Sequence, residues 1–488
     1  MATNIEIEPG AALESALVTT DSYENFEQMS SSLEEIKNSN FIPSTTTDEF
    51  LDNCNNLDND IHLNCSITST NSKDEEYLQD EEWLSKPKHV FVLSSAGKPI
   101  YSRFGNEDRF ASYFGIMQAL VSFVQADDDS IRSIHAGDTK FVFLFKEPLI
   151  LVAVSKTGEC TLQLTAQLNY VFNQIASTLT LSRLVKIYEQ RRNYDLRRLL
   201  TGVDRFIDHL LDFSENEPAF TLGAVQCLPL SSSIRDTISA AIIQSCSKIK
   251  NVVFGILLAK NQLITLVRMK KYYIHPHDLH LIFNLVQASE SFKTVESCWA
   301  PICLPRFDSS GFLYGHVSYL AEDCQACLIL LTVEGDAFSS LSEAKQRVVE
   351  RLRRGSCLEA INESLSSREE TCMEVGFPEV RHYLYKSKST AQFYQPHISA
   401  PYSSNHKRLM NIYKRAHYKL HCPTRPLKLL FERTPQDAIL AWDTRGFELY
   451  AVLEPLIETS SAISTVGRLL NWIKKREDKL FHLNAPTF

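Results

Sequence analysis

The sequence predicts an α/β (α+β) protein in which one small domain occurs three times after an acidic tail. Strand-like and helix-like segments recur in the order ββαβββα. Three copies of similar length can be cut at 89–200, 252–365 and 380–483. Many strands are apolar on both faces, as expected for mixed or antiparallel five-stranded sheets that are flanked by helices.

Residues 1–85 are predicted to form a disordered, acidic, regulatory tail. Residues 1–82 hold 19 acidic and 2 basic side chains, a net charge of −17, and show no sustained hydrophobic period. The rest of the chain carries 48 basic and 40 acidic residues, a net charge of +8. Ser31 and Ser32 lie just before acidic residues, a setting that acidophilic kinases favour. We expect phosphorylation there to strengthen a tail that shields a basic surface of the body.

The first domain is expected at 86–204. Five strands are predicted, at 89–95, 98–104, 131–136, 139–145 and 149–155. The helix between the second and third strands is indicated by apolar residues at helical spacing, namely Phe110, Tyr113, Phe114, Met117, Leu120, Val121 and Val124. A closing helix places four apolar residues on one face, namely Leu168, Phe172, Ile175 and Leu179.

The second domain is expected at 251–368 and the third at 376–488, with a helical connector at 205–250. Strands of the second domain are predicted at 251–259, 262–269, 298–304, 312–321 and 326–333, and helices near 276–292 and from about Ser339. Strands of the third are predicted at 380–387, 391–398, 427–433, 438–444 and 447–453, and helices at 405–421 and 459–480.

No residue pattern of an enzyme or a metal site stands out. The sequence lacks the phosphate-binding loop, the dinucleotide glycine motif, the nucleophile elbow and the H-E-x-x-H zinc motif. Four cysteines partly fit zinc spacing, but their strand context favours buried free thiols: Cys298, Cys303, Cys324 and Cys327. Three histidines at a helix start are expected to lie on the surface: His275, His277 and His280. We therefore expect no catalytic residue, metal or cofactor.

The opening of the first domain carries a family resemblance. The stretch "HVFVLSSAGKPIYSRFGNEDRF", with "MQALVSF" and "TKFVFLFKEPLILVAVSKTGE", resembles the first longin domain of the SAND family. These are the Mon subunits of the complex once called monensin sensitivity–calcium caffeine zinc sensitivity. The match covers roughly 83–488, including "FLYGHVSYL" and "KKREDKLF", and leaves out the tail. The resemblance implies three longin domains.

The resemblance also implies a function. Family members pair with a second trilongin subunit of the calcium-caffeine-zinc sensitivity type. The pair is a guanine-nucleotide exchange factor for the late-endosomal and vacuolar Rab GTPase. Exchange breaks no covalent bond, which agrees with the lack of catalytic motifs. We expect a role in early-to-late endosome maturation, fusion with the lysosome or vacuole, and autophagy.

Recruitment from the cytoplasm follows from the same resemblance. An early-endosomal Rab and phosphoinositides would bring the protein peripherally to endosome, lysosome or vacuole, and autophagosome membranes. No nucleic-acid partner is expected, and no segment approaches the ~18–20 apolar residues that a membrane span needs. Two alternatives stay open: a non-catalytic longin scaffold or tether, and a metal- or thiol-dependent enzyme that uses the cysteines.

Three surfaces are predicted from particular residues. The partner and GTPase surface is expected in the first domain at Phe110, Tyr113, Phe114 and Met117, unless these side chains are all core. A docking edge for the upstream Rab is expected at Trp299 and Ile302, in the proline-containing strand "CWAPICLP". Basic residues expected to contact lipid are Arg191, Arg192, Lys270, Lys271, Arg353, Arg354, Lys474 and Lys475.

Overall fold

The residues that the computed structural model describes all lie within Asp80–Phe488. Within it, the described residues are 83, 85–105, 110–191, 194–200, 202–289, 292, 296–321 and 324–488. Of the tail predicted at 1–85, residues 1–82 lie outside the described residues, so the predictions for Ser31 and Ser32 remain predictions. Its predicted end is wrong, because the Trp83 ring stacks on Phe110 at 5.0 Å and packs against the core of the first domain.

The first domain contains one antiparallel sheet with the strand order β2-β1-β5-β4-β3. Its strands are β1 (Lys88–Ser94), β2 (Pro99–Ser102), β3 (Ser133–Ala136), β4 (Thr139–Lys146) and β5 (Leu149–Ser155). Strand β1 explains the double-sided apolar pattern, because Val90 and Val92 enter one core cluster and Phe91 and Leu93 enter another. Both faces of the sheet are therefore covered.

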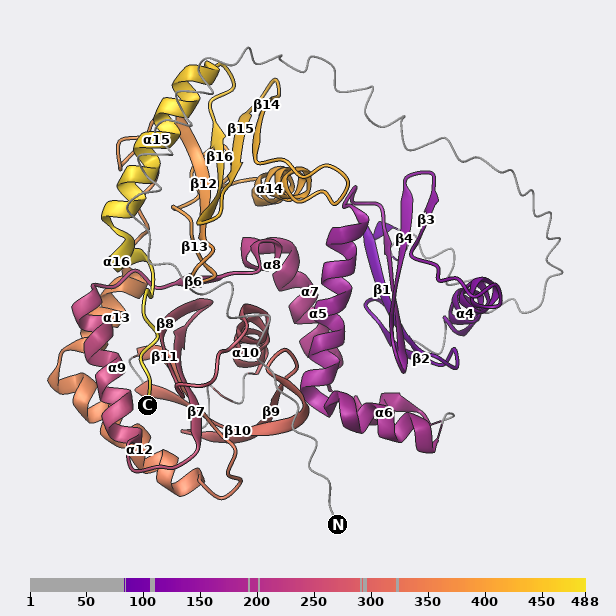
Figure 1. The fold of residues 1–488 in the computed structure, drawn as a ribbon, viewed down its shortest axis with the longest axis horizontal. Helices are drawn as coiled ribbons and strands as arrows, with labels where there is room; N and C mark the ends of the chain where they lie inside the picture. Colours follow the sequence, from indigo (N-terminus) through magenta and orange to yellow (C-terminus); the bar gives the residue numbers. More distant parts are fainter. Residues whose placement is uncertain are drawn as a thin grey trace. The chain divides into compact units, whose positions relative to one another are not determined.

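Helices cover the two faces of this first sheet (Figure 1). On one face lies α4 (Ala111–Gln125). The opposite face is covered by α5 (Thr161–Leu179), α6 (Leu181–Gln190), the 3₁₀ helix η3 (Leu196–Leu199) and α7 (Asp204–Asn216).

The second and third domains repeat this strand order. The second comprises β7 (Val252–Ala259), β8 (Gln262–Arg268), α10 (Pro276–Ala288), β9 (Cys298–Leu304), β10 (Asp308–Ala321), β11 (Cys324–Thr332), α12 (Phe338–Arg354) and α13 (Cys357–Ser366). The third comprises β12 (Val380–Ser387), β13 (Gln392–Tyr394), α14 (His406–Leu420), β14 (Leu429–Arg433), β15 (Ala438–Asp443), β16 (Phe447–Leu453), α15 (Thr459–Lys475) and α16 (Glu477–Leu480).

The sheets of the second and third domains are joined, which the sequence did not indicate. The connector contains α8 (Pro218–Leu222), β6 (Val225–Cys227) and α9 (Ser232–Cys246). Strand β6 pairs in parallel with β13 on one side and β8 on the other, so the two five-stranded sheets form part of one 11-stranded sheet (Figure 1). A short strand between two sheet edges supplies partners for backbone groups that would otherwise lack them. The connector is therefore not wholly helical.

Some predicted element ends shift for local reasons. The strand expected at 391–398 is short, because β13 ends at Tyr394, two residues before Pro396, which has no backbone N–H to donate. The helix expected at 459–480 divides at Arg476 into α15 and α16.

Candidate functional site

Helix α4 has an exposed apolar face. Ile116, Leu120 and Phe123 are 56%, 40% and 74% exposed, and their spacing of four and three residues places them on one side of the helix. The helix sequence "ASYFGIMQALVSFVQ" contains no charged residue. An exposed helix face normally carries charged residues, and contiguous apolar patches of this kind mark interaction sites.

The inner face of α4 holds most of the residues that were predicted for the partner surface. Phe110, Phe114 and Met117 are buried in a core cluster with side chains of β1, β4 and β5, so they cannot reach a partner. Tyr113 is half-buried and its ring lies 6.1 Å from that of Phe110. Leu120, one of the apolar residues whose spacing indicated this helix, is exposed. Phe110, Phe114 and Met117 are therefore core residues, and a partner surface on α4 stays a prediction.

The equivalent helices of the other two domains are covered by the chain itself. Like α4, α10 and α14 follow the second strand of their domain. Helix α10 packs against α7 and α5, and α14 packs against α8 and α7. Among the described parts of the three domains, α4 is the helix at this position with a row of large exposed apolar side chains.

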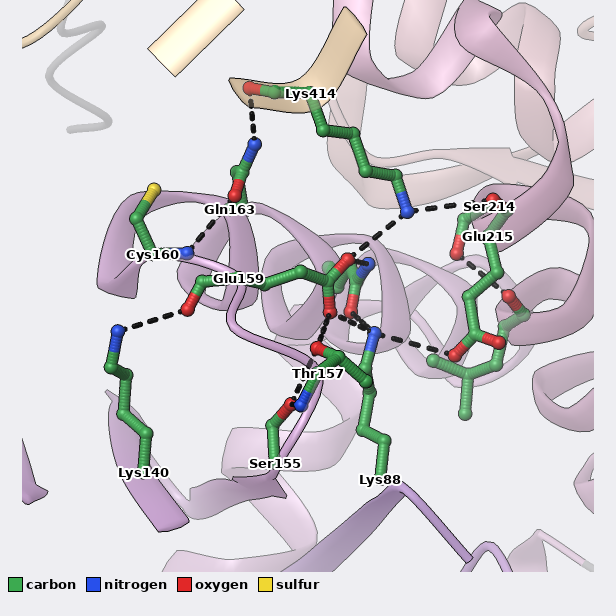
Figure 2. Close-up of polar contacts among 12 residues, drawn as sticks. Lys88, Lys140, Ser155, Thr157, Glu159, Cys160, Gln163, Ser214, Glu215 and Lys414 are labelled. Atoms are coloured by element: carbon green, nitrogen blue, oxygen red, sulfur yellow. Dashed lines mark hydrogen bonds and ion pairs between the residues drawn. The ribbon is translucent and has the colours of Figure 1, made fainter. Parts of the chain in front are cut away.

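A buried ion network fixes the first domain against the connector and the third domain (Figure 2). Lys88 of β1 pairs with Glu159, and their side chains are only 3% and 7% exposed. Lys414 of α14 reaches the same carboxylate at 3.0 Å. Lys88 also lies 3.3 Å from Glu215 of α7, and Arg103 donates to Glu215 at 2.6 Å. Three chain segments that lie far apart in sequence are thus tied together.

The buried network pairs positively charged side chains with negatively charged ones. Burial alone would raise the pKa of Glu159, but the ammonium groups of Lys88 and Lys414 lower it to about 2. Gln167 accepts from Lys88 at 2.9 Å and donates to Glu159 at 3.2 Å. The Gln163 side chain donates to the Lys414 backbone carbonyl at 2.8 Å. A satisfied buried network of this kind fixes geometry more than it adds stability, so it sets the orientation of the first domain.

The predicted docking edge is only partly open. Strand β9 does lie at the edge of the sheet. Ile302 is buried in the core, which corrects its assignment to a surface. Helix α5 packs against β9, and the Ser177 hydroxyl donates to the Cys303 carbonyl at 2.7 Å. The first domain therefore occupies one end of this edge.

Trp299 lies at the other end of β9 and is half-buried. Its ring stacks on Tyr314 with 5.8 Å between centroids and meets the edge of Phe338 at 5.9 Å. On the neighbouring strand, His316 is buried, and its two ring nitrogens have no hydrogen-bond partner. Burial lowers the pKa of His316 to about 4, so this imidazole is neutral at neutral pH. Docking at Trp299 stays a prediction.

The basic residues predicted to meet lipid lie at four separate places, namely after α6, after β8 and in the last turns of α12 and α15. Arg192 lies outside the described residues. The others are exposed, namely Arg191, Lys270, Lys271, Arg353, Arg354, Lys474 and Lys475. Arg353 and Arg354 lie in the last turn of α12, and Lys474 and Lys475 in the last turn of α15, where basic side chains also favour the helix dipole. Lipid contact therefore remains a prediction.

Three of the four cysteines lie as the sequence predicted, whereas one of the three histidines does not. The ten cysteines in the described residues are free, and Cys303, Cys324 and Cys327 are buried in strands while Cys298 is half-buried. His280 is fully buried, contrary to the expected surface position. It bonds to the Tyr170 hydroxyl and the Ala224 carbonyl, each at 2.9 Å, because α5 and the connector cover this side of α10.

Comparison with known proteins agrees with the threefold repeat. Three family descriptions match in order: "First Longin domain of FUZ, MON1 and HPS1" at residues 88–210, the second longin domain at 250–350 and the third at 379–477. A bacteriophytochrome structure from R. palustris aligns over 75% of this chain and 82% of its own, at 9% identity and a TM-score of 0.16, and nothing is inferred from it.

Curated relatives match over most of the chain. The vacuolar fusion protein MON1 homolog A of Gallus gallus is 45% identical over 85% of this chain and 76% of its own length. Protein SAND of Takifugu rubripes is 46% identical over 85% of this chain and 79% of its own. MON1 homolog B of Homo sapiens is 39% identical over 87% and 81%. Within the described residues no helix is both long and apolar enough to span a membrane. The chain belongs to the MON1/SAND family of vacuolar fusion proteins, with three longin domains.

Proposed function

We propose that this chain is one subunit of a heterodimeric guanine-nucleotide exchange factor for the late-endosomal and vacuolar Rab GTPase. Its partner is a second trilongin subunit, which covers the outer face of α4. The exchange factor drives early-to-late endosome maturation and fusion with the lysosome or vacuole, and it also acts in autophagy. Membership of a vacuolar fusion family supports this setting.

One observation carries the proposal of a partner subunit. The row of Ile116, Leu120 and Phe123 is exposed on a helix without charge, whereas the equivalent helices are covered within the chain. Depletion of charge and enrichment of large apolar side chains are typical of the centre of a protein interface. The buried network around Glu159 holds the first domain in place, so that this face is presented in a fixed orientation.

Nucleotide exchange needs no reacting group from the protein. An exchange factor binds the form of the GTPase whose switch loops no longer hold Mg²⁺ and phosphate, and so it favours release of nucleotide. We expect the GTPase to contact a composite surface made from the first longin domain of each subunit. The chain alone would then supply only half of the active surface.

The deciding experiment is release of fluorescent GDP from the late-endosomal Rab. The two-subunit complex should accelerate release well above either subunit alone and above an unrelated Rab used as a control. If a stable complex forms but release is not accelerated, the chain is a scaffold or tether and not an exchange factor. If no complex forms, the proposal of a partner on α4 fails as well.

Recruitment is tested separately from exchange. We propose that an early-endosomal Rab in its GTP form docks near Trp299 and that anionic phosphoinositides attract the exposed basic residues. Trp299→Ala should then reduce stimulation on membranes that carry the upstream Rab and leave release in solution unchanged. If the variant melts several degrees lower and is slow in solution too, the tryptophan is needed for the core of the second domain.

A further inference from the structure

Two histidines and a glutamate converge in the third domain, away from the exposed face of α4. His417 lies in the last turn of α14, His421 directly follows the end of that helix, and Glu448 reaches them from β16. Their ligand atoms all lie within 4.8 Å of one another. No other group of three metal-ligating side chains comes this close together among the described residues. The inference that follows does not depend on the proposed exchange activity.

The distances suit a tetrahedral metal ion. His421 Nε2 lies 3.3 Å from Glu448 Oε2. Two ligand atoms that are each 2.0–2.1 Å from a tetrahedral zinc ion lie about 3.3 Å apart, so this pair already has the required spacing. The ring centroid of His417 lies 4.4 Å from that of His421. The His417 ligand atom lies within 4.8 Å of the other two, so a movement of its side chain toward them would supply the third corner.

The carboxylate is held so that one oxygen faces the histidines. Lys386 donates to Glu448 Oε1 at 3.0 Å, while the Tyr450 hydroxyl donates to Oε2 at 3.1 Å. Lys388 pairs with Asp443 and also lies 3.8 Å from Glu448 Oε1. The two lysines and two carboxylates balance in charge, so affinity for a metal would come from the imidazole ligands and not from a negative field.

A cavity adjoins the two histidines of the cluster. Its volume is about 110 Å³, and His417 and His421 line it together with Leu162 and Tyr170 of α5 and Phe220 of α8. We propose that His417, His421 and Glu448 bind one zinc ion, with water from this cavity as the fourth ligand. Two imidazoles and a carboxylate suit zinc, whereas magnesium and calcium prefer oxygen ligands throughout.

Zinc at this position would join α14 to β16 beside the buried ion network. Lys414, which contacts Glu159, lies one turn before His417 on the same helix. A bound ion would therefore stiffen the helix through which the third domain holds the first. Binding should raise the melting temperature of the chain, because a ligand that binds only the folded state stabilises that state.

The experiment uses the full chain without a histidine tag, because a tag would itself bind zinc. Metal-free protein is titrated with zinc chloride in equilibrium dialysis, with magnesium chloride as a parallel titration. We expect one zinc per chain, a higher melting temperature with zinc and no change with magnesium. The double variant His417→Gln/His421→Gln should lose both effects, and the matched control His397→Gln, at an exposed histidine of the same domain, should keep them.

Cobalt substitution keeps the test decisive if the double variant fails to fold. The wild-type chain with one Co²⁺ should show the visible absorption of a tetrahedral ion with nitrogen and oxygen ligands. A sulfur-to-metal charge-transfer band would place the ion on a cysteine and overturn the proposal. The absence of stoichiometric zinc binding, or equal binding by a folded double variant, would overturn it as well.

Discussion

Helices α4 and α10 occupy the same position in two copies of one domain and meet different surroundings. Each follows the second strand and packs one face on its own sheet. The other side of α10 meets α5 and α7 and carries buried polar residues. His280 and Asn284 are both fully buried there, and Asn284 donates to the Gln174 side chain and the Phe206 carbonyl, each at 2.9 Å. The outer side of α4 is uncharged and exposed.

The composition of such a helix depends on whether the surface that covers it belongs to the same chain or to another one. A helix covered by its own chain can use buried polar groups, because their partners are always in place once the chain folds. A helix covered by another chain must also exist alone, and polar groups arranged for an absent partner would give that surface no benefit. Apolar side chains tolerate both states, so an uncharged outer face is the composition expected of α4 under the proposal that a second subunit covers it. The four substitution tests that follow are ordered by their expected effect on the stability of the chain.

Phe114→Ala should have the largest effect, because it empties a buried position between α4 and the first sheet. We expect a loss of ~3–5 kcal/mol in the free energy of unfolding. Phe123→Ala removes the same ring from the exposed face and should change stability by less than ~0.5 kcal/mol. Urea unfolding of both variants makes the comparison. Equal losses would contradict the assignment of the two faces.

Asn284→Ala tests the covered side of α10. The substitution leaves the Gln174 side chain, the Phe206 carbonyl and His209 without their partner, and we expect a loss of ~1–3 kcal/mol. Gln125→Ala, at an exposed position of α4, serves as the control and should be close to neutral. A neutral Asn284→Ala would mean that the contact between α10 and the first domain is looser than the hydrogen bonds indicate.

The repeated architecture could be predicted because local hydrophobic patterns indicate its strands and helices. Strand β1 has four consecutive apolar residues, Val90 to Leu93, and helix spacing recurs in all three domains. Strand β6 could not be found in this way, since three residues carry no period. Its role depends on β13 and β8, which lie far away in the sequence.

The candidate site was predicted only in part, for a similar reason. In α4 apolar residues occur all round the helix, so periodicity does not tell the buried Phe114 from the exposed Phe123. The contact between Glu159 and Lys414 joins residues 255 positions apart, and no local signal marks it. His417 and His421 have the spacing of a helical metal pair, but Glu448 joins them only through the fold.

A fall in pH should reduce stability through α10 and not through α4. Burial lowers the pKa of His280 to about 4, below its ordinary value of 6.5. The unfolded chain therefore takes up more protons than the folded chain below pH 6.5. The stability that neutral His280 contributes is present above pH 6.5 and is lost as the pH falls toward 4. Melting temperatures measured from pH 7 to pH 5 should fall less steeply in His280→Gln than in the wild type.

Helix α4 provides the contrast in the same experiment. It contains no titratable acidic, basic or histidine residue, so Leu120→Ala should keep the wild-type pH dependence. Burial also lowers the pKa of other histidines, such as His382. These histidines account for the pH dependence of the melting temperature that remains in His280→Gln. If His280→Gln follows the wild-type curve, the environment of α10 does not disfavour the charged imidazole.

The smallest effect on stability is expected for charges placed on the outer face of α4. Ile116→Glu/Phe123→Glu should change the free energy of unfolding by no more than ~0.5 kcal/mol per site, because both side chains are exposed. The same variant should weaken binding of the second trilongin subunit by tenfold or more, since buried apolar anchors dominate interfaces and a desolvated carboxylate opposes binding. The matched control Ser339→Glu/Gln346→Glu puts the same charges at the same spacing on the exposed face of α12 and should bind normally. If both variants bind normally, the face of α4 is not the interface. If both bind weakly, the added charge acts through the whole molecule and not through this surface.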